Sequence, residues 1–230
     1  MSNPTSARTV AARHYQDRPR KLLPTAPHAV TGALDLMGAS MSFARNEEIY
    51  GEAEPADFIY KVVSGAVRIY KVLNDGRRQI GAFYLPGDTF GMEVGDVHDS
   101  SAEAIGDVTV LVFKRSAVIA LAARDTEAAR RLWDMTAHEL RRAQEHMLLL
   151  IKNARERVAS FLFDMASRCS GKDEFELPMS RQDMADFLGL TIETVSRTLS
   201  QLEHAQVIAL PTSRRIALRN RAMLSRLTAS

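Results

Sequence analysis

One stretch decides the fold of this chain: Leu188-Gly-Leu-Thr-Ile-Glu-Thr-Val-Ser-Arg-Thr-Leu-Ser-Gln-Leu202, near the C-terminus. Gly189 predicts a tight turn, and Thr191 predicts the N-cap of a helix whose apolar residues form one stripe. Three polar side chains stand three and four residues apart on the opposite side, so they project together into solvent. These are Glu193, Ser196 and Arg197. A carboxylate, a hydroxyl and a guanidinium in this arrangement can read base edges in a DNA major groove.

A shorter helix is expected directly before this stretch. Pro178 leads into Ser180-Arg-Gln-Asp183, which has the form of a capping box, because the serine side chain can satisfy a free backbone N–H. The helix opened there ends at Gly189. Two short strands, 207–210 and 216–218, follow the longer helix. Helix, turn, helix and a two-stranded wing together form a DNA-binding unit.

The middle of the chain has a sequence pattern typical of short β-strands. Between residue 31 and about 120, short apolar runs alternate with glycines, and many short strands at this spacing indicate an antiparallel roll or barrel, since closure removes exposed edges. The expected strands are 58–63, 66–72, 79–84 and 108–113. Residues 1–30 carry arginines and prolines without periodicity and are expected to form a poorly ordered basic arm.

A seven-residue apolar repeat follows the β-type region. The spacing alternates between three and four residues, which is the a/d pattern of a coiled coil. The stripe consists of Trp133, Thr136, Leu140, Ala143, Met147, Leu150 and Ala154. Because the stripe is continuous and charged residues flank it, the pattern favours an interface between two copies of the chain. The alternative is a long helix that packs on its own domain.

These signals predict an α+β protein of four parts. A flexible basic arm spans 1–30, and an antiparallel β-roll spans 31–124. A long dimerisation helix spans 125–153. A winged helix-turn-helix domain spans 154–230 and opens with a helix at 155–168.

Composition limits the possible functions. With 46% hydrophobic and 25% charged residues among 230, the chain has the composition of a soluble globular protein. The net charge is only +2, so a polyanion must be met by local patches, such as the acid-free segment after His204 with its five arginines. The single Cys169 excludes an intramolecular disulfide and any multi-thiolate metal site, which suits a reducing cytoplasm. No apolar run approaches the roughly 20 residues that span a bilayer.

The order of roll, long helix and winged helix-turn-helix resembles the cyclic AMP receptor and FNR (CRP/FNR) superfamily of bacterial transcription regulators. Three segments carry the resemblance: Val63-Ser-Gly-Ala-Val-Arg-Ile-Tyr70, Leu85-Pro-Gly-Asp-Thr-Phe-Gly91 and Ser180 to Arg197. The last segment is the most specific. It resembles the FNR and FixK branch, whose recognition helix carries Glu-x-x-Ser-Arg. The resemblance also implies that the roll at 31–124 is of the cyclic-nucleotide-binding type and is similar to a sensor domain.

The sensors of the better-known members are missing from this sequence. Cyclic-nucleotide members hold the ribose with a Glu and the cyclic phosphate with an Arg, where this chain has Met92 and Ser100. A phosphate without its guanidinium partner is poorly held in a buried pocket. The cysteine cluster that holds the iron–sulfur cube of FNR is absent from the N-terminal arm. The resemblance therefore implies a FixK-like regulator that needs no cofactor.

Such regulators act as activators of genes for microaerobic or anaerobic respiration and, in rhizobia, for nitrogen fixation. Two alternatives remain open. The first is an effector-gated sensor with haem or another small ligand in the roll, since His98 lies in the loop where some gas-sensing relatives hold haem. The second is an interaction protein that keeps the helical scaffold without reading DNA. No sequence signature supports an enzyme.

Base recognition is expected from the longer helix. Arg197 can donate two hydrogen bonds to guanine O6 and N7, Glu193 can accept from a cytosine amino group, and Ser196 can touch a thymine edge. The resemblance implies that these side chains read the TTGA part of a TTGAT-type palindrome.

Phosphate contacts are expected around the same two helices and from the wing. The resemblance implies such contacts from Ser180, Arg181 and Gln182. Further contacts are expected from Thr191, Thr194, Arg214 and Arg215. The partners so implied are double-stranded DNA, a second copy of the chain and RNA polymerase.

Overall fold

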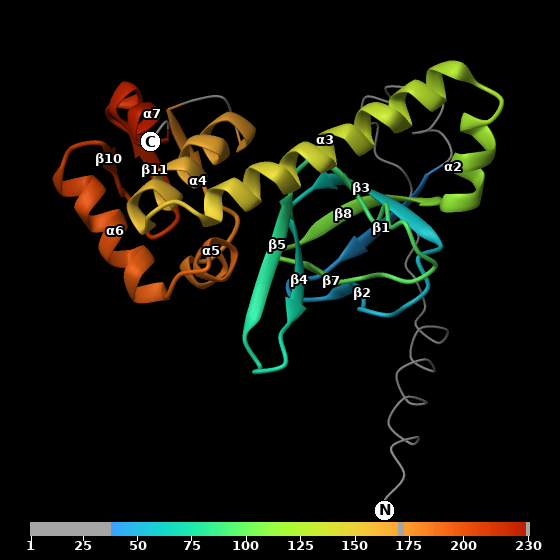
Figure 1. Cartoon of the computed structure of the whole chain (residues 1–230), viewed down its shortest axis with the longest axis horizontal. Helices are drawn as coiled ribbons and strands as arrows, with labels where there is room; N and C mark the ends of the chain where they lie inside the picture. Colours follow the sequence, from blue (N-terminus) through green and yellow to red (C-terminus); the bar gives the residue numbers. More distant parts are fainter. Residues whose placement is uncertain (1–37, 170–172, 229–230) are drawn as a thin grey trace, which may run out of the picture.

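The computed structural model describes residues 38–169 and 173–228 (Figure 1). The predicted arm 1–30 and residues 31–37 of the predicted roll lie outside the described residues. In chain order the elements are β1 (Ala39–Phe43), β2 (Glu48–Tyr50), β3 (Phe58–Ser64), β4 (Val67–Val72), β5 (Arg78–Tyr84), β6 (Thr89–Phe90), β7 (Ser101–Ala104), β8 (Val108–Lys114), α2 (Arg115–Ala122), α3 (Thr126–Leu150), α4 (Ala154–Cys169), β9 (Glu174–Glu176), α5 (Arg181–Leu188), α6 (Ile192–His204), β10 (Ile208–Ala209), β11 (Arg215–Leu218) and α7 (Arg221–Thr228).

Two four-stranded antiparallel sheets form the roll, with strand orders β1-β8-β3-β6 and β2-β7-β4-β5. Alternate residues of β3, such as Tyr60 and Val62, point between the sheets and are buried there. Gly65 makes the turn between β3 and β4 at a φ of 81°, where an added Cβ would lie 2.4 Å from the carbonyl oxygen of Asp107. The predicted fold class and roll are confirmed, although β1, β2, β6 and β7 were not predicted.

Helix α3 leaves the roll and crosses to the C-terminal domain (Figure 1). It begins at the N-cap Asp125, whose carboxylate accepts hydrogen bonds from the backbone N–H groups of Glu127 at 2.9 Å and Ala128 at 3.4 Å. The Tyr84 hydroxyl of β5 donates to Glu139 Oε1 at 2.5 Å and attaches the helix to the roll.

The prediction that this helix continues through Asn153 is wrong. Helix α3 ends at Leu150, and Asn153 forms a new cap with Glu156, because each side chain accepts from the backbone N–H of the other residue, both at 3.1 Å. Ala154, predicted as the last residue of the apolar stripe, is therefore the first residue of α4. The separate helix predicted at 155–168 is α4, so the error is confined to the last three residues of the long helix.

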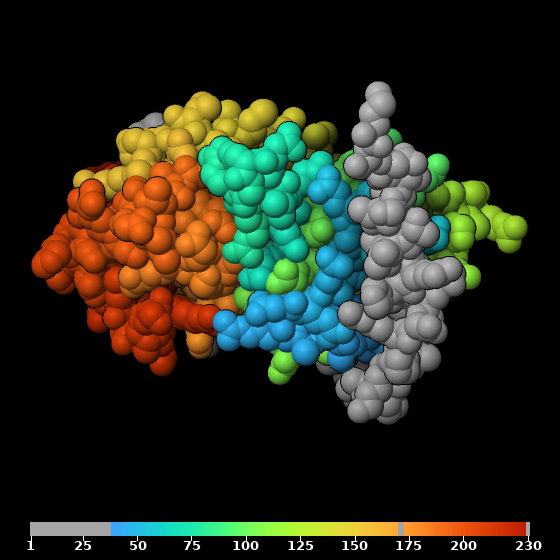
Figure 2. All heavy atoms as spheres, turned by 90° about the horizontal axis from the view of Figure 1, so that it is seen from below, coloured from blue at the N-terminus to red at the C-terminus, as the bar shows by residue number. Residues whose placement is uncertain are grey.

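The C-terminal domain contains α4 to α7 and a three-stranded antiparallel sheet of order β10-β11-β9. Its core continues into the roll. Phe83 of β5 lies 5.2 Å from the ring of Phe187 in α5 and 6.1 Å from that of Phe161 in α4. Figure 2 shows the C-terminal domain, in orange, lying directly against the cyan β4–β5 hairpin. One apolar cluster thus joins the roll to the helix-turn-helix domain, and a second cluster lies between the two sheets of the roll.

Two negative findings apply to the part of the chain that the structure describes. None of its helices is both long and apolar enough to cross a membrane. It also contains no group of three His, Cys, Asp or Glu side chains that could hold a metal ion.

Candidate nucleic-acid interface

Helix α5 and the turn after it have the predicted caps. Ser180 Oγ accepts from the backbone N–H of Asp183 at 3.1 Å, and Asp183 Oδ2 accepts from the Ser180 backbone N–H at 3.0 Å, which closes the capping box. Gly189 ends α5 in the left-handed region, with φ 61° and ψ 40°. The predicted helix start and turn are confirmed.

Helix α6 begins where the sequence predicts. The Thr191 hydroxyl accepts from the Thr194 backbone N–H at 3.2 Å and caps the helix. Val195, Leu199 and Leu202 are at most 1% exposed, so the predicted apolar stripe packs into the domain. The opposite face of α6 is therefore left for a ligand.

The three predicted base-reading residues lie on this solvated face. Glu193 and Arg197 are exposed, and Ser196 is half-buried beside them. The pKa of the Glu193 carboxyl lies below its usual range, first because its own backbone N–H donates to it and then because of a hydrogen bond with the Thr191 side chain. The carboxylate is therefore ionised at neutral pH and is suited to accept from a base amino group.

Arg181 connects the two predicted sets of DNA contacts. Its Nη1 donates to Ser196 Oγ at 3.4 Å, so a residue predicted to meet phosphate lies beside one predicted to read a base. The start of α5 thus lies next to the middle of α6. A duplex that met one helix would also meet the other.

Two other predicted phosphate contacts have intramolecular partners. The Ser180 hydroxyl donates to Asp183 Oδ2 at 2.7 Å, and Gln182 Nε2 donates to Asp186 Oδ1 at 2.6 Å. Both side chains would have to exchange these acceptors for a phosphate oxygen. Arg181, exposed in part and bound to a neutral hydroxyl, needs no such exchange.

The wing carries the remaining two predicted contacts. Arg215 is exposed and pairs with Glu174 of β9 at 2.5 Å, so its charge is partly neutralised. Arg214 is half-buried, and its Nη1 donates to the carbonyl oxygen of Pro178 at 3.4 Å.

Sequence reasoning missed Arg157, which organises the turn. Its Nη1 donates to the carbonyl oxygen of Leu188 at 2.8 Å, and its Nη2 donates to that of Leu150 at 2.6 Å. One guanidinium therefore joins the end of α3 to the end of α5 and satisfies carbonyls that the helices leave open. Nothing in the sequence around Arg157 distinguishes it from the other arginines of α4, so the sequence carries no signal for this role.

Most of the predicted stripe on α3 faces solvent in the single chain. Trp133, Leu140 and Met147 are 74%, 61% and 63% exposed. Thr136 and Ala143 are exposed as well, whereas Leu150 and Ala154 are half-buried within the chain. Large apolar side chains aligned on one helix and left exposed indicate a surface that another chain covers.

Aromatic rings fill the interior of the roll. Tyr60 lies 5.5 Å from the ring of Tyr50 and 5.1 Å from that of Phe90. His98 is 1% exposed, stacks on Tyr50 at 3.5 Å, and has its Nδ1 3.2 Å from Glu93 Oε1. This histidine is thus held within the core by its neighbours.

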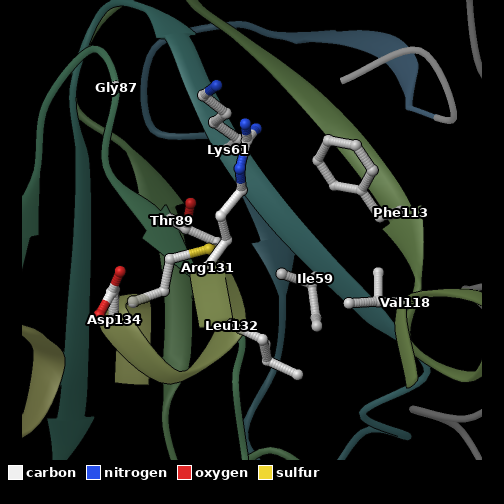
Figure 3. Close-up of a pocket in the computed structure, with 10 residues that line it drawn as sticks. Ile59, Lys61, Gly87, Thr89, Phe113, Val118, Arg131, Leu132 and Asp134 are labelled. Atoms are coloured by element: carbon white, nitrogen blue, oxygen red, sulfur yellow. The ribbon is translucent and has the colours of Figure 1, made fainter. Parts of the chain in front are cut away.

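A separate cavity of about 320 Å³ lies on the outer face of the sheet, between the roll and helices α2 and α3. Figure 3 shows apolar side chains, among them Ile59, Phe113 and Val118, on one side of it. Lys61 and Arg131 extend their nitrogen atoms on the other side. This cavity is distinct from the aromatic interior of the roll.

The geometry defines a class of protein, in which a winged helix-turn-helix is joined to a β-roll by a long helix. Two family models match: a Crp-like helix-turn-helix domain over residues 156–227 and a cyclic nucleotide-binding domain over residues 40–125. The chain is 53% identical over 207 residues to the nitrogen fixation regulation protein FixK of Azorhizobium caulinodans, which covers 87% of this chain and 82% of that protein.

Further comparisons agree with this match. The nitrogen fixation regulation protein FixK of Rhizobium meliloti is 43% identical over 176 residues, 76% of this chain and 80% of that protein. The solved structure of FixK2 from Bradyrhizobium japonicum superposes with a TM-score of 0.81 at 54% identity, over 84% of this chain and 98% of that one. The chain belongs to the CRP/FNR superfamily, in its FixK-like branch, and is a transcription regulator with a helix-turn-helix DNA-binding domain.

The two roll positions that were compared with the cyclic-nucleotide members, Met92 and Ser100, carry uncharged side chains. Met92 packs with Ile59 and Phe113 on the outer face of the sheet, and the half-buried Ser100 provides only a hydroxyl. Neither position supplies a carboxylate or a guanidinium. Tyr50, with Tyr60 and the other aromatic rings, occupies the space between the sheets.

Proposed function

We propose that this protein is a homodimeric transcription activator that reads a TTGAT-type palindrome without a cyclic nucleotide or an iron–sulfur cluster. The observation that carries the proposal is the solvated face of α6, where Glu193, Ser196 and Arg197 project together. The relatives named for nitrogen fixation regulation support target genes for nitrogen fixation or for microaerobic and anaerobic respiration. Activation in the cytoplasm would bring the dimer into contact with RNA polymerase.

The chemistry of each side chain supports this half-site. Arg197 can donate two parallel hydrogen bonds to O6 and N7 of the guanine, and the ionised Glu193 can accept from the cytosine amino group on the opposite strand. Ser196 is short enough to let the helix lie deep in the groove, near a thymine edge. Arg181 lies beside Ser196 and can reach the adjacent phosphate.

The exposed stripe on α3 supports the dimer. Trp133, Leu140 and Met147 would be buried against the same residues of a second copy, as the two-fold symmetry of a palindrome requires. Leu148 and Ile151, 58% and 80% exposed, extend the apolar surface toward the C-terminal domain.

The filled interior of the roll supports activity without an effector. Tyr50, Tyr60 and Phe90 occupy the space between the sheets, and buried His98 is already stacked and paired with Glu93. A haem or nucleotide would have to displace these side chains. The alternative of an effector-gated sensor predicts a stoichiometric ligand in the purified protein, which absorbance and native mass would detect.

Fluorescence anisotropy with a TTGAT-N4-ATCAA duplex tests the proposal, without any effector added. Arg197→Ala is expected to weaken binding roughly 5- to 150-fold per half-site. Replacing the half-site guanine by 7-deazaguanine, which lacks the N7 acceptor, should weaken the wild type but leave the Arg197→Ala variant unchanged. Arg130→Ala, which removes a 72% exposed arginine near the far end of α3, is the matched control.

Two outcomes would contradict the proposal. Equal binding of this duplex by the wild type and by Arg197→Ala would reject the assigned recognition. A monomeric mass for the wild type in analytical ultracentrifugation would reject the dimer. If the dimer is correct, Leu140→Glu is expected to give monomers and to lose the affinity that comes from joining two half-sites.

A further inference from the structure

The carboxylate of Asp183 acts in two directions at the start of α5. Its Oδ2 belongs to the capping box with Ser180. Its Oδ1 accepts from two arginines of the roll, from Arg68 Nη1 at 3.0 Å and from Arg78 Nη2 at 2.6 Å. One side chain therefore ties the first turn of the helix-turn-helix to strands β4 and β5, more than 100 residues earlier in the chain.

This Arg68–Asp183–Arg78 cluster is largely shielded from water. The side chains of Asp183 and Arg68 are 5% and 10% exposed. Arg68 Nη2 also donates to Glu103 and, at 3.2 Å, to Asn46 Oδ1. Removing one member of such a buried cluster leaves a charge without its partner, which is strongly unfavourable.

Arg78 reaches two carboxylates of α5 at once. Its Nε donates to Asp186 Oδ2 at 2.8 Å while its Nη2 binds Asp183. The fork of a guanidinium holds two acceptors in one fixed geometry, which a lysine ammonium cannot reproduce. Asp183 and Asp186 are three residues apart, so the contact fixes the rotation of α5 as well as its distance from the roll.

The apolar contacts between the same two domains have a different effect. Phe83 packs against Phe161 and Phe187, and this apolar contact helps to hold the roll against the C-terminal domain. Hydrophobic contact is non-directional, so it tolerates small rotations of one surface on the other. Charge-assisted hydrogen bonds with fork geometry are directional and restrict those rotations.

The geometry points to Arg68 and Arg78 as positioning residues for DNA recognition: by binding Asp183 they hold α5 and α6 at one angle to α3. This inference rests on the proposed function, in which α3 joins two copies on a palindrome. The angle between α6 and α3 then sets the separation of the two recognition helices. Each base pair added between the two half-sites moves them apart by about 3.4 Å along the DNA axis. If the angle between α6 and α3 is fixed, the dimer binds tightly at only one spacer length, that is, one number of base pairs between the half-sites. If the angle can vary, the dimer can bind at several spacer lengths.

The test compares operators whose TTGAT and ATCAA half-sites are separated by three, four or five base pairs. The wild type is expected to bind the N4 duplex roughly 100-fold or more tightly than the others, because a wrong spacer lets only one half-site bind. Arg78→Ala should reduce this preference to roughly tenfold or less. Its affinity for a scrambled duplex should stay unchanged, since α6 itself is intact.

Two companion variants separate positioning from general loss of stability. Arg77→Ala removes the neighbouring arginine, which is 78% exposed and pairs with Asp75, and should retain the wild-type spacer preference. Arg78→Lys keeps the charge but cannot bind Asp183 and Asp186 together, so its preference should lie between those of the wild type and Arg78→Ala. A uniform loss of affinity for all three spacers by Arg78→Ala would overturn the inference, as would behaviour equal to that of Arg77→Ala.

A measurement without DNA keeps this inference separate from the proposed function. If the wild type fails to distinguish the TTGAT operators from scrambled DNA, the proposed recognition has failed. Hydrogen exchange of the free protein then still tests whether the Arg68–Asp183–Arg78 cluster holds α5 and α6 in place. Arg78→Ala should speed amide exchange in residues 180–204 and leave β3 and β8 unchanged. Unchanged exchange in residues 180–204 would overturn the inference as well.

Discussion

The turn between α5 and α6 offers a sharp test of the local energetics. Gly189 adopts φ 61° and ψ 40°, a conformation that costs a residue with a Cβ about 1–2 kcal/mol. An alanine Cβ there would lie 3.5 Å from Arg157 Nη1 and 3.6 Å from Leu150 Cδ2, which are ordinary contacts, so no steric cost is added. Alanine also lowers the conformational entropy of the unfolded chain, which offsets roughly 0.4–1 kcal/mol of this conformational cost. Gly189→Ala should therefore destabilise the protein by about 1 kcal/mol.

Urea unfolding followed by circular dichroism measures this difference, which should appear as a lower midpoint with an unchanged m-value. Gly189→Asn is the matched control, because asparagine tolerates the left-handed region. Its free energy of unfolding should therefore fall less than that of Gly189→Ala. Gly189→Val should lose more than alanine, since β-branching adds strain there. A neutral or stabilising Gly189→Ala would refute the reasoning, and so would equal losses for asparagine and valine.

Three further predictions concern single groups. Asp125→Ala removes the cap of α3 and should lower the free energy of unfolding by about 1 kcal/mol, and an unchanged thermal midpoint would contradict it. For Asp183, burial alone would raise the pKa, but hydrogen bonds from Ser180 and the charges of Arg68 and Arg78 outweigh it and hold the pKa below its usual range. Because the folded pKa is lower than the unfolded value of about 4, the stabilisation is present above that pH and is lost as the pH falls through the folded pKa. The difference in unfolding free energy between the wild type and Asp183→Asn should thus be constant from pH 8 to 5 and shrink between pH 4 and 3; a constant difference down to pH 3 would contradict this. Burial raises the pKa of the Cys169 thiol, so iodoacetamide should alkylate it more slowly than free cysteine at pH 8, whereas an equal rate would show that the thiol is not shielded.

The sequence predicted the elements whose signals are local. Ser180, Asp183, Gly189 and Thr191 mark the ends of α5 and α6 through hydrogen bonds that span at most three residues or through one backbone angle. Short apolar runs separated by glycines located β3, β4, β5 and β8. A short strand such as β6 (Thr89–Phe90) carries too few residues to show a period, so it was not predicted.

The same reliance on periodicity explains the error at the end of α3. The apolar spacing continues without a gap from Leu150 to Ala154, so it does not show that the long helix ends at Leu150, three residues before the predicted end. The Asn153–Glu156 cap between them stops that helix and starts another. A local pair of hydrogen bonds therefore overrides the repeat, because the backbone N–H groups at a helix start must find acceptors.

The sequence by itself determined that this chain carries a recognition helix, because the polar and apolar faces of α6 follow from the order of its residues. It also determined which side chains share the solvated face, Glu193, Ser196 and Arg197. Only the tertiary structure decided how that helix is held. Arg157 binds Leu188, and Arg68 and Arg78 bind Asp183, across separations of 31 to 115 residues. Such contacts depend on how the chain brings distant residues together, and neither the spacing nor the type of an arginine shows which carbonyl or carboxylate it will meet.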